Sequence, residues 1–165
     1  MHPDEVACKE LWMKAFGDDE QFADSFIMRY YSRRRMLTAE AEGRMAAMLH
    51  LLPFRTELGR TTYIYGVATD PAFRGRGLAS QLMREAMRLI AERGDDAALL
   101  IPTPGKEWLR EFYGRFGFAG DVPARFVSAD RFDFGTGDAA ADRAMVWRRD
   151  SSVPLPEQLT ASWHS

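Results

Sequence analysis

The sequence predicts an α/β protein in which helices pack on a mixed β-sheet. Two strand-to-helix transitions indicate this class. The apolar run 63–69 is followed by a Gly-rich turn and an amphipathic run that ends near Arg93. The apolar run 97–101 is followed by a short aromatic helix around Trp108. With 165 residues, 46% of them hydrophobic, the chain can bury one sizeable core, so we expect a single domain over 1–150.

The first elements are expected to be two helices. Apolar residues recur at helical spacing from Glu5 to Phe16, and the Gly17-Asp18-Asp19 sequence ends this run and offers a cap for the next helix. The second helix carries an apolar stripe that is typical of a core face: Phe22, Phe26, Ile27, Tyr30 and Tyr31. The basic cluster 33–35 follows and is interpreted as a solvated helix end.

Three strands are expected next. The segments 36–40 and 44–54 indicate a hairpin around Glu42-Gly43, and the segment 61–69 forms the third strand after the Gly59-Arg60 turn. Pro71 ends this strand, because a proline disfavours helix at the residue before it.

The strongest helix signal begins at Gly77. Apolar side chains recur on one face up to Ile90, charged ones occupy the other face, and Gly94 ends the run. The strand 97–101 is apolar throughout, as expected for a strand covered on both faces. The segments 124–132 and 144–148 indicate a last hairpin, and the tail 151–165, with Pro154 and Pro156, is expected to be loosely held.

Composition excludes several classes of function. The net charge is -2 and the charges are interspersed, so nucleic-acid binding through a broad basic surface is disfavoured. Cys8 is the only cysteine, which excludes an intrachain disulfide and a cysteine-built metal site and fits a reducing cytoplasm. The sequence shows neither an apolar stretch of membrane-spanning length nor a signal-like N-terminus, so we expect a cytoplasmic protein without a membrane partner.

The turn between the third strand and the long helix predicts a phosphate site. Its sequence is Arg74-Gly75-Arg76-Gly77-Leu78-Ala79-Ser80. The first amides of a helix have no partner within it, and together with the helix dipole they attract anions. Glycines at 75 and 77 permit a close approach of a ligand to the main chain.

Two other phosphate-binding patterns fit less well. A dinucleotide fingerprint beginning at Gly75 would end on Ser80, where a glycine or alanine is required, although Asp95 and Asp96 lie near the place of a ribose-binding acid. A P-loop needs a lysine after its last glycine, and the chain has none there.

At this point the chain resembles the GNAT superfamily of acyl-CoA-dependent N-acetyltransferases. That family's pyrophosphate loop has the form Gln/Arg-x-x-Gly-x-Gly/Ala after a strand, and Arg74, Gly77 and Ala79 match it. A second family pattern, Tyr-x-x-x-Gly-Phe, matches the segment from Tyr113 to Phe118. The resemblance covers roughly residues 36–118. It implies a mixed, mostly antiparallel sheet of six or seven strands with a V-shaped splay, flanked by about four helices.

The resemblance implies that acetyl-CoA is the acyl donor. The amides of residues 75–79 would hold its pyrophosphate, with the Ser80 hydroxyl and the Arg74 charge assisting. The main chain of Val67, Ala68 and Thr69 would pair with the pantetheine arm, which lies in the splay like an added strand. An amide near Val67 or Ala68 would meet the thioester carbonyl. The cofactor residues expected are therefore Val67, Ala68, Thr69, Arg74, Gly75, Arg76, Gly77, Leu78, Ala79 and Ser80, with no metal.

Tyr113 matches the position of the family's general acid. Its phenol could protonate the departing CoA thiolate, whereas the alternative is a packed aromatic beside Phe112 and Phe116. The general base is left unassigned, because the strand 61–69 lacks Asp and Glu. Candidates for the base are His50, Glu57, Tyr63, Tyr65 and Asp70.

The acceptor is expected to be a small-molecule or peptide primary amine, attacked directly in a ternary complex. The resemblance implies that the first two helices and the final hairpin line its site, around Gly17, Phe26, Tyr30 and Phe134. A non-catalytic acyl-CoA sensor and a nucleic-acid-associated acetyltransferase are the alternatives. A homodimer and an edge strand before the first helix are left open.

Overall fold

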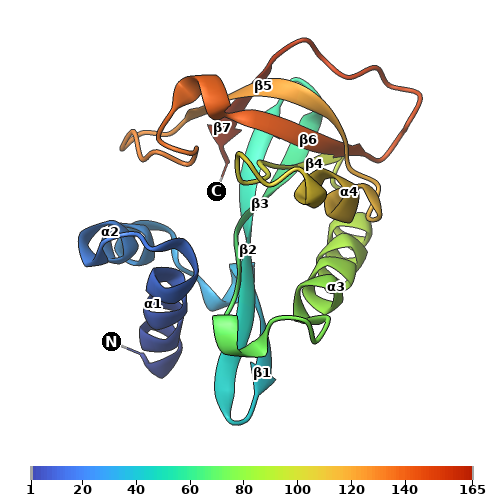
Figure 1. Ribbon diagram of the computed structural model, residues 1–165. Helices are drawn as coiled ribbons and strands as arrows, with labels where there is room; N and C mark the ends of the chain where they lie inside the picture. The colour runs from blue at the N-terminus through green and yellow to red at the C-terminus, as the bar shows by residue number, and fades with distance from the viewer. Residues whose placement is uncertain (1, 165) are drawn as a thin grey trace. The chain divides into compact units, whose positions relative to one another are not determined.

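The computed structural model describes residues 2–164 and contains four helices and a seven-stranded mixed sheet (Figure 1). The order of the strands in the sheet is β1-β2-β3-β4-β6-β5-β7. Contacts divide the chain into two compact units, one made of residues 1–51 and 65–86 and the other of residues 52–64 and 87–165. The predicted α/β class, with a mixed sheet of six or seven strands and about four helices, is confirmed. None of the helices in the described part is long and apolar enough to cross a membrane.

The first unit begins with two helices that pack against each other, drawn in blue in Figure 1. Helix α1 (Pro3–Phe16) starts one residue after its N-cap His2, and α2 (Glu20–Tyr30) starts after Asp19, whose carboxylate accepts the Phe22 amide at 2.7 Å. Because His2 is already a helix cap, the described residues contain no edge strand before α1. Arg33–Arg35 form a short 3₁₀ turn, in which the Arg35 guanidinium donates to the Tyr30 carbonyl at 2.7 Å.

The strands of the first unit form the predicted hairpin. β1 (Met36–Ala41) pairs antiparallel with β2 (Arg44–Thr56), and both turn residues, Glu42 and Gly43, have positive φ, as a type I′ turn requires. β3 (Gly59–Thr69) lies beside β2 and ends in the 3₁₀ turn Pro71–Phe73. Helix α3 (Leu78–Arg93) then begins directly after the Gly-rich turn.

The second unit holds the remaining strands. β4 (Ala97–Leu100) runs parallel to β3, and its four residues are all buried, as the apolar run predicted. Helix α4 (Trp108–Gly114) precedes β5 (Ala119–Val127), which pairs antiparallel with β6 (Arg143–Arg148). The predicted hairpin is therefore confirmed, but its first strand lies five residues earlier than expected, and the segment 128–132 is a loop.

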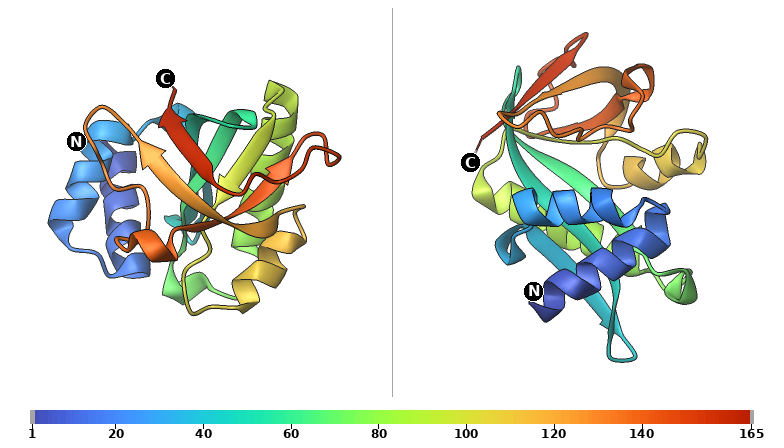
Figure 2. Two further views of the ribbon diagram at one scale, coloured as in Figure 1. Left: turned by 90° about the horizontal axis from the view of Figure 1, so that it is seen from above. Right: turned by 90° about the vertical axis from the view of Figure 1, so that its left-hand side faces the viewer.

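The expectation of a loosely held tail is wrong for its last residues. Leu159–Trp163 form β7, which runs parallel to β5 and pairs antiparallel with β2 at Phe54 and Arg55. Leu159 and Ala161 are buried. In Figure 2 this strand, in red, lies beside β5, in orange.

Strand β7 also closes the second unit into a ring. Within this unit the hydrogen-bonded order is β2, β3, β4, β6, β5 and β7, and the pairing of β7 with β2 returns to the first strand. Six aromatic rings meet one another from four of these strands and the loop after β5: Phe54, Tyr63, Phe126, Phe132, Phe134 and Trp163. The Tyr63 hydroxyl donates to the Phe134 carbonyl at 2.7 Å, which ties this loop to β3.

Candidate functional site

The turn before α3 presents backbone amides without intrachain partners. The Gln81 amide donates to the Gly77 carbonyl at 3.0 Å, which marks the first helical hydrogen bond. Among residues 2–164, no acceptor is found for the amides of residues 75–80. Because a helix N-terminus with free amides attracts anions, this turn fits a phosphate group.

Both glycines of the turn adopt backbone angles that favour glycine. Gly75 has φ +79° and Gly77 has φ +75°, and open space surrounds the place of a Cβ at each. The segment 74–77 is exposed, and residues 78–80 are half-buried. A ligand can therefore reach the main chain of the turn without displacing any side chain.

The end of β3 leaves one backbone edge unpaired. The β3–β4 ladder runs only from Thr61 to Tyr63, opposite Ala97 to Leu99, whereas β3 continues to Thr69. Within the described chain, β2 is the only strand that flanks β3 beyond this ladder. The other edge of the segment that contains Val67, Ala68 and Thr69 is thus open to an extended ligand, which could pair with it as an added strand.

A close-packed aromatic cluster of the first unit supports this end of β3. Gly66 has φ +64°, and a Cβ there would lie 2.8 Å from Trp12 Cζ3 and 3.0 Å from His50 Cδ2. The Trp12 ring stacks on Phe26 with centroids 4.8 Å apart and also contacts Tyr65. The backbone next to Val67 is therefore fixed by side chains from α1, α2 and β2.

His50 lies in this cluster as a neutral side chain. It is 1% exposed, and burial, followed by the charge of Arg35, lowers its pKa to about 3. Its Nε2 atom lies 3.9 Å from the thiol of Cys8, whose own pKa burial raises to about 12. Both groups are uncharged at neutral pH, so His50 is a poor proton acceptor.

The other candidates for a base take part in structural interactions. The Glu57 carboxylate accepts the Thr160 amide at 2.8 and 3.1 Å, and Tyr63 donates to Phe134. Asp70 caps the 3₁₀ turn by accepting the Ala72 amide at 2.9 Å, and this bond, assisted by Lys14, lowers its pKa. Tyr65 is half-buried in the aromatic cluster.

Tyr113 lies on α4 in the second unit and is 7% exposed. Its ring meets Phe112 edge to face at 5.1 Å, as the packing alternative expected. Burial raises the pKa of Tyr113 to about 12. The phenol therefore keeps its proton at neutral pH, which a proton donor requires.

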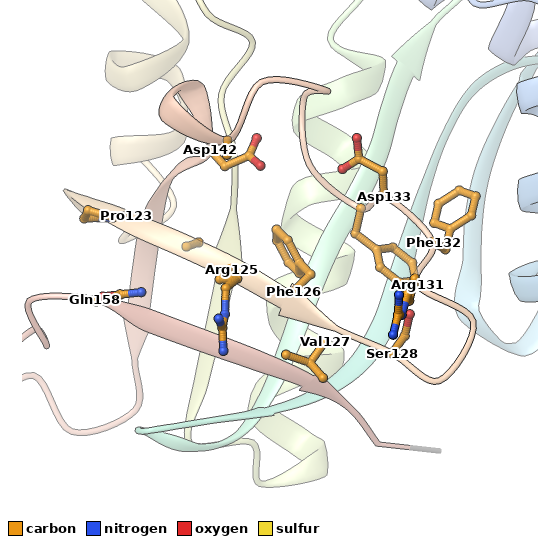
Figure 3. Close-up of a pocket in the computed structure, with 13 residues that line it drawn as sticks. Pro123, Arg125, Phe126, Val127, Ser128, Arg131, Phe132, Asp133, Asp142 and Gln158 are labelled. Carbon is orange, nitrogen blue, oxygen red and sulfur yellow. The ribbon is translucent and has the colours of Figure 1, made fainter.

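A pocket of about 710 Å³ lies on the second unit, between β5 and the loop that follows it. Figure 3 shows Phe126, Asp133 and Asp142 on one side of β5, and Arg125 extending from the other side. Phe132 and Phe134 add aromatic surface to the pocket. Composition alone gave no signal for this pocket, although Phe134 was expected near the acceptor. Within the described residues, no group of three or more His, Cys, Asp or Glu could hold a metal ion.

Comparisons with solved structures show the same fold. The YhbS GNAT family N-acetyltransferase of Escherichia coli, solved with CoA, matches with a TM-score of 0.67 and 19% identity over 99% of this chain and 86% of that chain. A GNAT family acetyltransferase of Brucella melitensis, solved with acetyl-CoA, gives a TM-score of 0.66 and 16% identity over 100% and 93% of the two chains. The PaiA N-acetyltransferase of Thermoplasma acidophilum, solved with coenzyme A, gives 0.53 and 14% over 87% and 89%.

No curated protein matches the chain. A family model described as an acetyltransferase (GNAT) domain matches residues 3–120, which include both the Gly-rich turn and the Tyr113 segment. A match over this much of the chain establishes its family: the protein belongs to the GNAT acetyltransferases.

Proposed function

We propose that this protein transfers an acetyl group from acetyl-CoA to a primary amine, by direct attack in a ternary complex. The observation that carries the proposal is the set of amides at residues 75–80 that lack intrachain acceptors at the start of α3. Five of these amides, from Gly75 to Ala79, hold the CoA pyrophosphate, and the side chains of Arg74 and Ser80 assist. The unpaired edge at Val67, Ala68 and Thr69 takes the pantetheine arm.

In the proposed reaction the neutral amine attacks the thioester carbon. A C–N bond forms, the C–S bond breaks, and the proton that the amine loses passes to solvent water. An amide near Val67 or Ala68 stabilises the oxyanion that develops on the carbonyl. Tyr113, which is protonated at neutral pH, donates its proton to the CoA thiolate and regains a proton from solvent water before the next turnover.

We propose that the pocket beside β5 on the second unit binds the acceptor. Its rings of Phe126, Phe132 and Phe134 suit an apolar body, and the carboxylates of Asp133 and Asp142 lie on the same side of the strand. We propose that the acceptor is an amine with an apolar substituent, because such a molecule uses both kinds of surface.

Calorimetric titration with acetyl-CoA tests the donor site directly. Gly77→Asp places a negative charge where the pyrophosphate binds, so we expect binding to be abolished. Gly94→Asp is the matched control, because Gly94 has nearly the same φ, +76°, and also has open space at its Cβ position. Undiminished affinity in Gly77→Asp would overturn the assignment of the turn.

Thiol release separates the enzyme from its alternatives. With acetyl-CoA and a panel of amines, an acetyltransferase releases free CoA, whereas a sensor binds acetyl-CoA without turnover. Binding without release for every amine would favour the sensor. Binding to RNA that weakens steeply with salt would favour the nucleic-acid-associated alternative.

A further inference from the structure

Two arginines from distant parts of the first unit meet on one phenylalanine ring. The Cζ atoms of Arg44 and Arg76 each lie 4.9 Å from the centre of the Phe73 ring. Arg76 belongs to the Gly-rich turn, and Arg44 begins β2. Phe73 is 1% exposed, so its ring is a fixed support for both guanidinium groups.

The position of the ring relative to Arg44 is set by backbone bonds. Phe73 ends the 3₁₀ turn that follows Asp70. The Asp70 amide donates to the Ala46 carbonyl at 2.8 Å, which ties this turn to β2 two residues after Arg44. The Asp70 carboxylate accepts the Ala72 amide at 2.9 Å and so closes the turn itself. These bonds place the Phe73 ring close to both Arg44 and Arg76, so the backbone brings the two arginines together.

Neither guanidinium group makes a close ion pair among the described residues, although the charge of Arg44 helps to lower the pKa of Asp70. Within residues 2–164, no carboxylate lies within 4.0 Å of Arg44 or Arg76, whereas Arg33, Arg88 and Arg110 each have such a partner. The nearby Asp70 is engaged by the Ala72 amide and by Lys14 at 3.4 Å. A chain with a net charge of -2 thus keeps two positive charges, without a close carboxylate partner among the described residues, next to its proposed phosphate-binding turn.

The donor of the proposed reaction carries a phosphate that the turn amides do not account for. CoA has a diphosphate on the 5′ oxygen of its ribose and a separate phosphomonoester on the 3′ oxygen of the same sugar. The amides of residues 75–79 are matched to the diphosphate. The 3′-phosphate is a dianion close by, and guanidinium groups bind phosphate oxygens through paired N–H donors.

We propose that Arg44 and Arg76, supported by Phe73, bind the 3′-phosphate and make the protein selective for CoA over 3′-dephospho-CoA. This inference rests on the proposed use of acetyl-CoA. Arg44 contacts the nucleotide end of the donor, remote from the thioester, so it sets donor affinity and leaves the chemical step alone.

The test compares two ligands on the intact protein. Calorimetric titrations with acetyl-CoA and with acetylated 3′-dephospho-CoA give the preference of each variant as a ratio of dissociation constants. We expect the wild-type protein to prefer acetyl-CoA by about tenfold or more, and Arg44→Gln to reduce this preference about tenfold. Affinity for the dephospho ligand should be unchanged in Arg44→Gln.

Arg34→Gln is the matched control, because Arg34 is an exposed arginine of the same unit that does not stack on Phe73. It should keep the wild-type preference, and thermal melting should show that both variants are folded. Equal affinity of the wild-type protein for the two ligands, or equal weakening of both by Arg44→Gln, would overturn the inference while leaving acetyl-CoA as the donor. Failure of both ligands to bind the wild-type protein would instead overturn the proposed function, and this inference with it.

Discussion

Burial makes the phenol of Tyr113 a weaker acid than that of a free tyrosine. Its pKa of about 12 arises from desolvation of the phenolate, because water cannot reach the charged form. A phenol with this pKa is protonated throughout the neutral range, as the proposed proton donor must be, and an unburied tyrosine would be protonated there too. The same burial keeps His50 neutral with a pKa of about 3, although an unperturbed histidine would titrate near neutrality.

Replacing Tyr113 by phenylalanine removes the proposed proton donor and keeps the packed ring. We expect Tyr113→Phe to lower kcat about a hundredfold or more, because general acid catalysis contributes on that scale. The dissociation constant of acetyl-CoA should stay unchanged. Thiol release under saturating acetyl-CoA measures the first quantity, and calorimetry measures the second.

Tyr31→Phe is the control for this substitution, since it deletes the same atom elsewhere. The Tyr31 hydroxyl is buried and has no hydrogen-bond partner among the described residues, so its loss should leave turnover intact. Full turnover in Tyr113→Phe would return Tyr113 to a packing role beside Phe112.

At the scale of single elements, the structure explains why β3 has a glycine at position 66, near the proposed thioester site. Any other residue at this position would have to adopt a positive φ, and its Cβ would clash with the ring of Trp12. We expect Gly66→Ala to lower the free energy of unfolding by about 3 kcal/mol, combining the left-handed backbone with overpacking. Equilibrium denaturation in urea measures this loss.

Gly43→Ala separates the two causes, because Gly43 has a positive φ but open space around its Cβ position. It should cost about 1 kcal/mol, the backbone part alone. Equal losses at both positions would show that the Trp12 contact adds nothing.

The elements differ in how well local sequence predicts them. Helices α1, α2 and α3 were predicted within a few residues, because their apolar periodicity and caps such as Asp19 act over one or two turns. β5 was placed five residues late, since Gly120 and Pro123 look like loop residues and yet lie within the strand. Tertiary pairing with β6 and β7 outweighed the local preference.

Those parts of the candidate site that are continuous in sequence were predictable, whereas those that depend on contacts between distant residues were not. The turn from Arg74 to Ser80 is continuous in sequence, so its glycine pattern predicted both free amides and left-handed angles. The pairing of Arg44 with Arg76 on Phe73 was not predicted, because it depends on a hairpin bringing distant residues together. The bonds that occupy Glu57, Tyr63 and Asp70 are likewise tertiary.

At the scale of the whole molecule, β7 decides whether the second unit has open edges. Removing residues 159–165 would expose unpaired backbone on β2 and β5 and would uncover the core where Leu159 packs. We expect this truncation to cost at least about 3 kcal/mol and to cause association of the chains. Urea denaturation and size-exclusion chromatography measure the two effects.

A chain that ends at His164 is the control, because it keeps all of β7. A monomeric truncated protein with full stability would contradict the closed ring as a source of stability. It would also imply that the parallel β5–β7 pairing contributes little to the native state.

The closed ring also affects how the second unit folds during synthesis. Trp163 pairs with Phe54, so the strand that completes the second unit is synthesised long after β2. Until β7 has been synthesised, β2 and β5 each have an unpaired backbone edge. The ring closes through contacts between residues that are far apart in sequence, and such contacts form slowly. The nascent chain therefore passes through a period in which it is prone to aggregation, and this period ends when β7 has been synthesised and has paired.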